Sequence, residues 1–264
     1  MNRLEGRVVL ITGAGRGLGH GVARGLVRYG ATVIGVSRTV SELEALAAEI
    51  REAGGEIDTP SVDLSQPAEI EALAQRVIER YGRLDALINN AAILRNRPFL
   101  DLTAEEFDET IEVNLMAPVR LIRAFLPTML AQGHGAIINV SSRAGIQPFE
   151  NETDYCAAKY GLEGFSFSLA IELQPKNISV NVVSPGYRIK PTSVTAEEFA
   201  RWPEERRAEY RDPIDMADAF AYLAVQDGSG VTGQRFNAFD LAERVRQEGW
   251  DWTPTPAPSD AERA

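Results

Sequence analysis

Three residues in the middle of the chain carry side chains that can move a proton on and off an oxygen atom. Tyr155 and Lys159 are four residues apart, and Ser142 precedes them. On a helix, residues i and i+4 share a face, so the Lys159 ammonium is expected to lie near the Tyr155 phenol. A nearby cation favours the phenolate and lowers the tyrosine pKa from about 10. The spacing therefore predicts an acid/base pair, although it also occurs by chance in many helices.

A glycine-rich turn near the start of the chain lies in the setting that binds dinucleotides. Residues 7–11 are apolar, as in a buried strand, and a helical pattern runs from 17 to 29. Glycines let the backbone approach a pyrophosphate, which a helix N-terminus also attracts. The turn thus predicts a dinucleotide site, the alternative being an ordinary strand-to-helix turn. Its predicted cofactor contacts are Gly13, Gly15, Arg16, Gly17, Leu18 and Gly19.

The end of the second expected strand indicates which dinucleotide binds. NAD-binding sites commonly carry Asp or Glu there to hold the ribose hydroxyls. This chain has Ser37 followed by Arg38, with no carboxylate at the strand end to repel a phosphate. The guanidinium groups of Arg38 and Arg16 can hold a 2′-phosphate through charge-assisted bonds. We therefore predict NADP(H); if Arg38 is only a solvated loop charge, NAD is the alternative.

Apolar strand patterns alternate with helical patterns along most of the chain. This alternation predicts an α/β fold, a Rossmann-type doubly wound sheet of seven mostly parallel strands with helices on both faces. Ser41 before Glu44 and Thr103 before Glu106 are expected capping boxes at two helix starts. The expected strands are 7–11, 32–36, 57–62, 84–88, 135–140, 178–184 and 231–236. The expected helices are 17–29, 41–53, 67–81, 104–131, 153–173, 213–225 and 239–248.

These motifs, in this order, resemble the short-chain dehydrogenase/reductase family over about residues 6–234. The glycine turn fits the family's signature at the first strand, and Ser184-Pro185-Gly186 fits its turn after the sixth. The resemblance implies one Rossmann-type domain that moves a hydride between NADP(H) and a ketone or secondary alcohol. It also implies further cofactor contacts at Asp63, Leu64, Asn90, Ala91, Ala92, Pro185 and Gly186.

The resemblance implies a role for each member of a catalytic group of four. Tyr155 is expected to be the general acid/base, and Ser142 to hold and polarise the carbonyl oxygen. Lys159 is expected to lower the Tyr155 pKa and to bind the nicotinamide ribose, so Tyr155 and Lys159 also count as cofactor contacts. Asn114 would hold a water that links Lys159 to solvent. The alternative for Asn114 is an amide packed against strand ends.

The chain departs from the family pattern near the expected nicotinamide end of the cofactor. Lys190 stands where a threonine usually contacts the nicotinamide amide. Either Thr192 or the backbone of Ile189 is expected to take that place. After Thr232-Gly233-Gln234, the usual glycine pair is replaced by residues 237–241.

The substrate is expected to touch three variable segments, 93–98, 143–151 and 187–211. The last is long for a connection and is expected to act as a lid, with a short helix after Thr195. The cationic residues of these segments favour an anionic or highly polar substrate, unless they are simply solvated. They are Arg95, Arg97, Arg143, Arg188 and Lys190.

Length, net charge and composition indicate which kinds of domain, partner and cellular location to expect. The 264 residues suit one catalytic domain, placed at 1–240, followed by a C-terminal helix and tail at 241–264. The net charge of −11 argues against a nucleic-acid partner. No apolar run is long enough to cross a membrane, and the two histidines lack metal-ligand spacing, so neither a membrane nor a metal is expected. The single cysteine, Cys156, fits a reducing cytoplasm.

Two regions bear on assembly. The long apolar helices expected at 104–131 and 153–173 predict a homodimer or homotetramer. The end of the chain, with Trp250 and Trp252, is expected either to fray or to dock on a neighbouring subunit near the substrate.

The leading hypothesis is an NADP(H)-dependent carbonyl reductase acting on a small-molecule ketone or secondary alcohol. A 3-oxoacyl carrier and a sugar or polyol remain open as substrates, and so does the physiological direction. One alternative is an NAD-dependent alcohol dehydrogenase of the same family. The other is a non-catalytic NADP(H)-binding sensor, which the altered region at Lys190 motivates.

Overall fold

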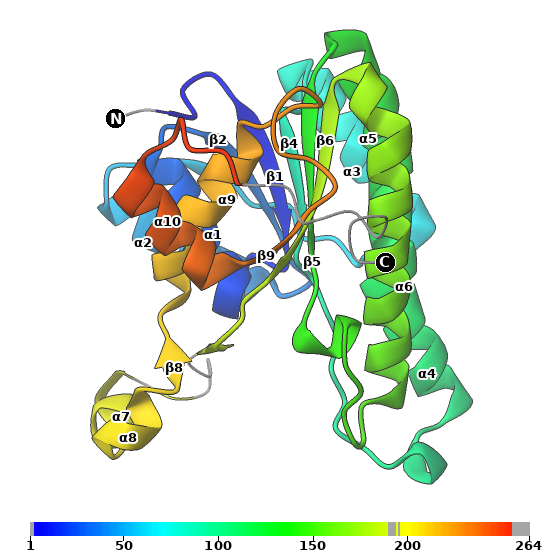
Figure 1. The fold of residues 1–264 in the computed structure, drawn as a ribbon, viewed down its shortest axis with the longest axis vertical. Helices are drawn as coiled ribbons and strands as arrows, with labels where there is room; N and C mark the ends of the chain where they lie inside the picture. The colour runs from blue at the N-terminus through cyan, green and yellow to red at the C-terminus, as the bar shows by residue number, and fades with distance from the viewer. Residues whose placement is uncertain (1–2, 190–193, 195, 255–264) are drawn as a thin grey trace, which may run out of the picture.

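A parallel sheet forms the centre of the molecule (Figure 1). The computed structural model describes residues 3–189, 194 and 196–254. Within them, the largest sheet has seven strands in the order β3-β2-β1-β4-β5-β6-β9, all parallel, which confirms the predicted fold class. The strand order reverses between β1 and β4, and ligands bind at the carboxyl ends of strands at such a reversal. The strands are β1 Val8–Thr12, β2 Thr32–Val36, β3 Ile57–Asp58, β4 Ala86–Asn89, β5 Gly135–Val140, β6 Ile178–Ser184 and β9 Arg235–Asn237.

Helices cover both faces of this sheet (Figure 1). One face carries α1 (Gly17–Arg28), α2 (Val40–Glu52), α9 (Ala217–Ala224) and α10 (Ala238–Glu248). The other carries α3 (Pro67–Tyr81), α5 (Ala117–Gln132) and α6 (Thr153–Leu173). A further helix, α4 (Ala104–Ile111), runs into α5 through a π-helical segment at Glu112–Met116.

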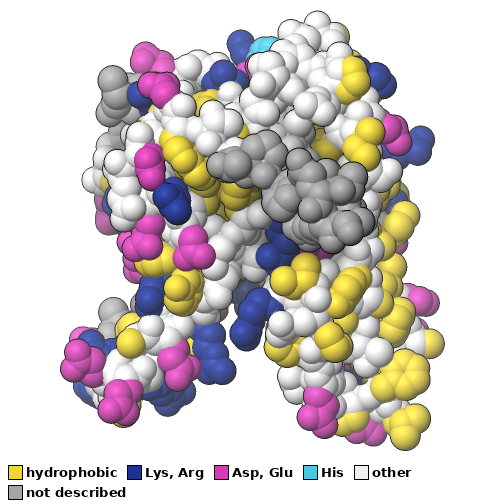
Figure 2. Space-filling view, in the orientation of Figure 1, with side chains coloured by type: hydrophobic (Ala, Val, Ile, Leu, Met, Phe, Trp, Pro, Cys, Tyr) yellow, Lys and Arg dark blue, Asp and Glu magenta, His cyan; other side chains and the backbone are white. Residues whose placement is uncertain are grey.

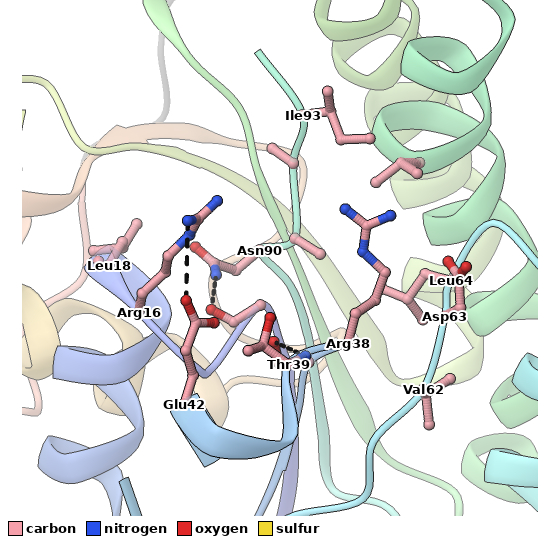
Figure 3. Close-up of a pocket in the computed structure, with 16 residues that line it drawn as sticks. Arg16, Leu18, Arg38, Thr39, Glu42, Val62, Asp63, Leu64, Asn90 and Ile93 are labelled. Atoms are coloured by element: carbon pink, nitrogen blue, oxygen red, sulfur yellow. Dashed lines mark hydrogen bonds and ion pairs between the residues drawn. The ribbon is translucent and has the colours of Figure 1, made fainter. Parts of the chain in front are cut away.

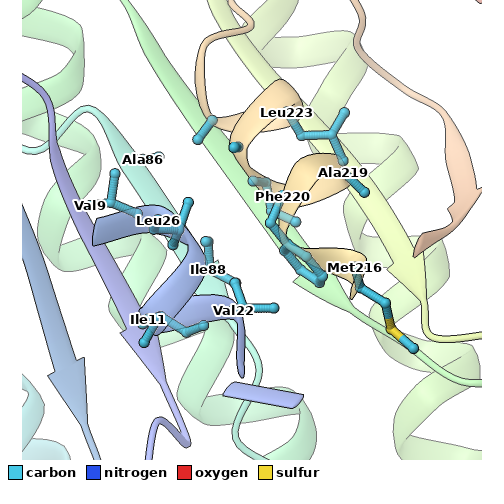
Figure 4. Packing of buried hydrophobic residues seen from close by; sticks show 14 of the residues in the cluster. Val9, Ile11, Val22, Leu26, Ala86, Ile88, Met216, Ala219, Phe220 and Leu223 are labelled. Atoms are coloured by element: carbon cyan, nitrogen blue, oxygen red, sulfur yellow. The ribbon is translucent and has the colours of Figure 1, made fainter. Parts of the chain in front are cut away.

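Successive strand residues belong to two separate hydrophobic cores. On β1, Val9 and Ile11 belong to the core under α1 and α9, whereas Val8 and Leu10 belong to the core under α3 and α5. This division follows from the alternation of side chains along a strand. Figure 4 shows Phe220 of α9 packed on the first of these cores, where it is completely buried. Burying a side chain of this size stabilises the fold by about 1.5–3 kcal/mol.

The stretch Ala104–Gln132 is the one described helix that is long and apolar enough, by length and composition, to cross a membrane. The expectation that no segment passes this test was therefore wrong. Its apolar residues have another explanation, because Leu121, Phe125 and Met129 are buried in the core beneath α3. An apolar composition is what a helix packed on a parallel sheet requires.

Several predicted boundaries move in the structure. The strand predicted at 57–62 is only Ile57–Asp58 plus a single bridge at Ser61, since Pro60 has no N–H to donate to a ladder. The last strand begins at Arg235 because Gly233 turns the chain just before it. The capping box at Thr103 is confirmed. The one predicted at Ser41 is wrong, since α2 already begins at Val40.

The described residues of the segment 187–211 project from the sheet as an arm (Figure 1). It contains β7 (Arg188–Ile189), α7 (Ala196–Ala200), α8 (Glu204–Arg207) and β8 (Tyr210–Arg211), with β7 and β8 paired in parallel. The rings of Phe199, Trp202 and Tyr210 pack together, with centroids 5.3–6.0 Å apart. The short helix predicted after Thr195 is confirmed as α7. Thr195, Lys190 and Thr192 themselves lie outside the described residues.

The chain after α10 packs on its own subunit. The Trp250 ring meets Tyr29 at the end of α1 edge-on, with centroids 5.2 Å apart. The Tyr222 hydroxyl of α9 donates a hydrogen bond of 2.6 Å to the Trp252 carbonyl. For these two residues, therefore, the expectation of a frayed tail was wrong, whereas docking on a neighbouring subunit stays a prediction. Residues 255–264 lie outside the described chain.

Candidate active site

A cleft of about 330 Å³ opens at the carboxyl ends of β1, β2 and β4 (Figure 3). Three loops meet there: Gly13 follows β1, Ser37 follows β2 and Asn90 follows β4. The cleft thus lies where the strand order reverses, and it brings together most of the residues predicted to contact a cofactor. Its walls are formed by Gly13, Arg16, Gly17, Leu18, Ser37, Arg38, Thr39, Glu42, Val62, Asp63, Leu64, Asn90, Ala91, Ala92, Ile93 and Val113.

The glycine turn is fastened to the loop after β4. The Asn90 side chain donates to the Thr12 carbonyl over 2.8 Å, and the Thr12 hydroxyl accepts from the backbone N–H groups of Asn90 and Ala91, each over 3.0 Å. Gly19 lies beneath this turn, where a Cβ would stand 2.2 Å from the Gly13 carbonyl oxygen. Gly19 therefore shapes the floor of the cleft without lining it.

The N-terminus of α1 faces this turn and is free to bind an anion. Arg16 occupies the N-cap in an extended conformation, and no side chain among the described residues caps the helix. The first turn also contains no acidic residue. Unpaired N–H groups and the positive end of the helix dipole favour a phosphate, so the turn fits the pyrophosphate of a dinucleotide.

Arg16 and Arg38, which are labelled in Figure 3, line the cleft together with Ser37, the residue that follows β2. Glu42, from the first turn of α2, also lines the cleft, with its carboxylate 3.9 Å from the Arg16 guanidinium. The strand end carries no carboxylate, as predicted, but the next helix supplies one. Arg38 lies 3.7 Å from Glu109 of α4, so both arginines are held by weak, solvent-exposed ion pairs.

Six other predicted contacts do not line this cleft, among them Tyr155 and Lys159, which are described below. Gly15 packs beneath it, where a Cβ would stand 2.6 Å from the Glu42 carboxylate. Pro185, Gly186 and Ile189 follow β6, on the far side of β4 and β5. Gly186 adopts φ +77°, and a Cβ there would overlap the Asn237 side chain at 1.8 Å. Only glycine fits this turn, because its backbone is left-handed and Asn237 fills the space.

The predicted acid/base group lies at the carboxyl end of β5. Ser142 follows that strand and hydrogen-bonds the hydroxyl of Tyr155, which α6 presents. Lys159, one turn further along α6, donates 2.8 Å to the Val140 carbonyl at the end of β5. Tyr155 and Lys159 are 9% and 2% exposed, so both side chains are largely shielded from water.

The electrostatics of this group differ from the sequence prediction. Burial raises the pKa of the Tyr155 hydroxyl to about 12, although the Ser142 hydrogen bond opposes that rise. Burial also lowers the pKa of the Lys159 ammonium to about 8, against the opposing charge of Glu163. The Lys159 nitrogen lies 5.6 Å from the centroid of the Tyr155 ring and is bound to the Val140 carbonyl. Desolvation therefore outweighs the predicted effect of the cation, and Tyr155 is a neutral phenol near pH 7.

Asn114 is completely buried in the π-helical segment before α5. Its amide oxygen accepts from the Ile93 N–H, and its amide nitrogen donates to the Ile93 carbonyl, each over 2.7 Å. Asn114 thus fastens the loop that forms one end of the cleft. Its contacts are with this loop and not with the strand ends that the sequence suggested as the alternative, and its catalytic role stays a prediction. The widened helical turn is a feature often found at functional sites.

Comparison with known proteins agrees with this geometry. A profile described as short chain dehydrogenase matches residues 7–201. The chain belongs to the short-chain dehydrogenase/reductase family. It is accordingly an oxidoreductase of the class that interconverts C–OH and C=O groups. The chain is 34% identical over 235 residues to a 3-oxoacyl-[acyl-carrier-protein] reductase of Thermotoga maritima, covering 88% of this chain and 96% of that protein. It is 36% identical over 241 residues to nodulation protein G of a Rhizobium species, covering 89% and 96%.

Solved structures of family members superimpose over most of the chain. A metagenomic short-chain oxidoreductase in complex with NADP is 37% identical, with a TM-score of 0.76 and coverage of 88% of this chain and 98% of that one. A variant of actinorhodin polyketide ketoreductase with NADPH is 34% identical, with a TM-score of 0.77 and coverage of 87% and 94%.

The surface is hollowed between the arm and the lobe that contains α4, and Lys and Arg side chains are visible in the hollow (Figure 2). Most rim arginines predicted to attract an anionic substrate are already paired. Arg97 binds Glu106 at 2.6 Å, and Arg188 lies 3.3 Å from Glu209. Arg95 is bound by Glu109. Arg143 stacks over the Phe149 ring at 5.4 Å. These pairs weaken the argument from charge for an anionic substrate.

Some residues of the site were not foreseen from the sequence. The cleft is also lined by Thr39, Glu42, Val62 and Val113, and by Ile93, which was expected only as part of the substrate-contacting segment 93–98. A helix start placed at Val40 would have indicated Glu42, because the first turn of α2 faces the glycine turn. Within the described part of the chain, no group of three or more His, Cys, Asp or Glu residues could hold a metal ion.

Proposed function

We propose that the protein is an NADP(H)-dependent carbonyl reductase that converts a small-molecule ketone into a secondary alcohol. One observation carries this proposal: Ser142, Tyr155 and Lys159 converge at the end of β5, next to a dinucleotide-shaped cleft. The relatives solved with NADP or NADPH support the choice of cofactor.

Different residues of the cleft are proposed to bind different parts of the cofactor. The glycine turn and the N-terminus of α1 hold the pyrophosphate. Arg16, Ser37 and Arg38 hold the 2′-phosphate by charge-assisted hydrogen bonds. When bound, NADPH supplies a hydride to the carbonyl carbon. The adenine and nicotinamide ends are assigned to Asp63, Leu64, Asn90, Ala91, Ala92, Pro185, Gly186 and Ile189.

Tyr155 donates the proton that the carbonyl oxygen needs. A pKa of about 12 keeps its hydroxyl protonated at neutral pH, as a proton donor requires. Ser142 holds the same oxygen by a hydrogen bond. Lys159 binds the nicotinamide ribose, and Asn114 positions the loop at Ile93 and a water on the path that reprotonates Tyr155.

Residues 1–240 form the catalytic domain of this proposal, with 187–211 as a lid over the substrate. Its aromatic cluster makes the arm a stiff unit, so closure would occur where β7 and β8 join it to the domain. The segment 241–264 contributes most of α10 and, after it, Trp250, whose ring packs on Tyr29 at the end of α1. The single cysteine fits the cytoplasm, where we place the protein.

Glu42 is the observation that favours the alternative cofactor. A carboxylate near this end of the cleft is what an NAD-binding site uses to hold ribose hydroxyls. In the structure, however, Glu42 faces Arg16 and lies close to Gly15. NAD dependence is therefore the second candidate, and a direct comparison of NADPH and NADH rates decides between them.

The proposed activity is tested by following NADPH absorbance with a panel of carbonyl compounds. The panel contains 3-oxoacyl thioesters, ketose sugars and small cyclic and linear ketones. We expect oxidation of NADPH with at least one of them, and slower oxidation with NADH. Tight NADPH binding without turnover on any member would instead favour a cofactor-binding sensor.

We further propose that the protein assembles as a homodimer or homotetramer through the outer faces of α5 and α6. Leu130 on α5 and Tyr160, Phe167 and Ile171 on α6 are exposed, with Ile171 76% accessible. The double substitution Phe167→Glu/Ile171→Glu should yield monomers in sedimentation velocity. Val40→Glu, at an exposed apolar residue of α2, should leave the assembly unchanged. A monomeric wild-type chain at micromolar concentration would contradict this proposal.

A further inference from the structure

A partly buried ion pair joins α6 to β9 beside the catalytic group, whereas the cofactor cleft lies at the ends of β1, β2 and β4. Glu163 of α6 is 5% exposed, and its Oε1 accepts from the Arg235 Nε of β9 over 2.9 Å. The second nitrogen of the same guanidinium, Nη2, donates to the Ser142 carbonyl over 3.0 Å. One arginine therefore joins a buried carboxylate to the backbone of a residue that the proposed reaction uses.

The loop after β5 is shaped to admit this pair. Gly145 lies three residues beyond Ser142, and a Cβ there would stand 2.8 Å from the Glu163 Oε1 atom and 2.5 Å from the Ser141 hydroxyl. Any larger side chain would displace the carboxylate. The loop, Glu163 and Arg235 thus fit together as one unit around the Ser142 backbone.

Glu163 also faces Lys159, which is one helical turn earlier on α6. The groups that the described contacts place around Lys159 are Tyr155 and Glu163 on its own helix and the Val140 carbonyl of β5. Arg235 of β9 binds the Glu163 carboxylate on this side of Lys159. Glu163 is therefore the carboxylate that opposes the desolvation of the Lys159 ammonium.

Stability alone does not account for this arrangement. The second carboxylate oxygen of Glu163, Oε2, is buried without a hydrogen-bond partner in the described structure. A buried ion pair with incomplete hydrogen bonding is commonly no more stable than apolar residues of the same size. The pair is thus better explained by what it does to Ser142 and Lys159.

We propose that Glu163 and Arg235 are positioning residues of the reductase, which fix the backbone at Ser142 and supply the negative charge that faces Lys159. The inference rests on the proposed carbonyl reductase activity for its kinetic consequences. Its electrostatic part does not depend on turnover.

The charge is tested by removing it. The chain contains three lysines, Lys159, Lys176 and Lys190. Lysines labelled with 13C at the ε-carbon therefore give an NMR spectrum of three signals. The signal that disappears in Lys159→Met is that of Lys159. Glu163→Gln keeps the shape of the side chain and removes its charge. We expect the Lys159 titration midpoint to fall by about one pH unit, since an opposite charge is lost. The change in kcat at alkaline pH should then occur at a pH that is lower by the same amount.

Positioning is tested by a substitution that keeps the charge. Arg235→Lys retains a cation beside Glu163 but loses the planar fork that also reaches the Ser142 carbonyl. We expect kcat to fall about tenfold while KM changes less than about twofold, because only the alignment of Ser142 is disturbed. The Lys159 midpoint should stay in place.

Two further variants serve as a control and as a replacement for Glu163→Gln if that protein does not fold. Glu172→Gln changes an exposed carboxylate on the same helix and should alter neither readout. If Glu163→Gln does not fold, Glu163→Gln/Arg235→Gln leaves no lone buried charge, and its Lys159 midpoint should still lie below that of the wild type. An unchanged midpoint in the folded charge variants would overturn the proposal, even if they melt at lower temperature. A shifted midpoint in a protein without carbonyl turnover would instead contradict only the proposed function.

Discussion

Replacing Tyr155 with phenylalanine should lower kcat by about 1,000-fold or more, because it removes the proton donor from the reaction. The substitution deletes one oxygen atom and leaves the ring in its pocket on α6. The Ser142 hydroxyl, which hydrogen-bonds the buried phenol, would remain, but it is proposed to hold the carbonyl oxygen and not to give up its proton. Turnover is measured by NADPH absorbance, and cofactor binding by NADPH fluorescence.

Cofactor binding should survive this change within about threefold, since one neutral hydrogen bond contributes little to a dinucleotide held mainly through its phosphates. Tyr160→Phe is the matched control, because Tyr160 is on the same helix and 46% exposed. It should leave kcat unchanged. Retention of most of the activity in Tyr155→Phe would refute the assignment of Tyr155 as the acid.

Replacing Arg38 with aspartate should raise the KM for NADPH by about 100-fold, while the KM for NADH changes by less than about threefold. The substitution removes a guanidinium from the end of the cleft near β2 and puts a like charge where the 2′-phosphate is proposed to bind. Arg38 is 55% exposed and only loosely paired with Glu109, at 3.7 Å. It is therefore free to turn toward a phosphate. Steady-state kinetics with both cofactors measure the effect.

Two further variants distinguish a 2′-phosphate contact of Arg38 from a general effect of charge and from NAD dependence. Arg51→Asp makes the same change in charge at an exposed position at the far end of α2, and should affect the two cofactors equally and weakly. Glu42→Gln should improve NADPH binding if the Glu42 carboxylate opposes the phosphate. Weaker NADH binding in Glu42→Gln, together with equal losses for both cofactors in Arg38→Asp, would instead indicate an NAD-dependent enzyme.

The sequence was a good guide wherever local geometry decides the outcome. The glycine turn was found because strand, turn and helix follow one another along the chain. Tyr155 and Lys159 were paired because a helix repeats its face every four residues. Even the short helix of the arm followed from its acidic first turn. Boundaries moved where a single residue interrupts a pattern, as Pro60 does in β3 and Gly233 before β9.

The sequence misled where the result depends on what packs around a group. Lys159 was expected to lower the Tyr155 pKa, yet desolvation raises it. The rim arginines looked like a substrate-binding cluster, but α4 supplies Glu106 and Glu109 to two of them. Trp250 and Trp252 looked like a free or intersubunit tail, but they pack beside Tyr29 and Tyr222.

From its sequence alone, this protein could be assigned a seven-stranded parallel fold, a dinucleotide turn and an acid/base pair on one helix. The fold and the turn follow from short-range periodicity and from the residue types, whereas the acid/base pair also rested on the resemblance to the family, because its spacing occurs by chance in many helices. The tertiary structure decided which charges meet and which groups lose water. Glu163 and Arg235 are 72 residues apart, and no pattern along the chain reports their contact. Such pairings, and the pKa values that depend on burial, arise only when helices and strands take their positions on the sheet.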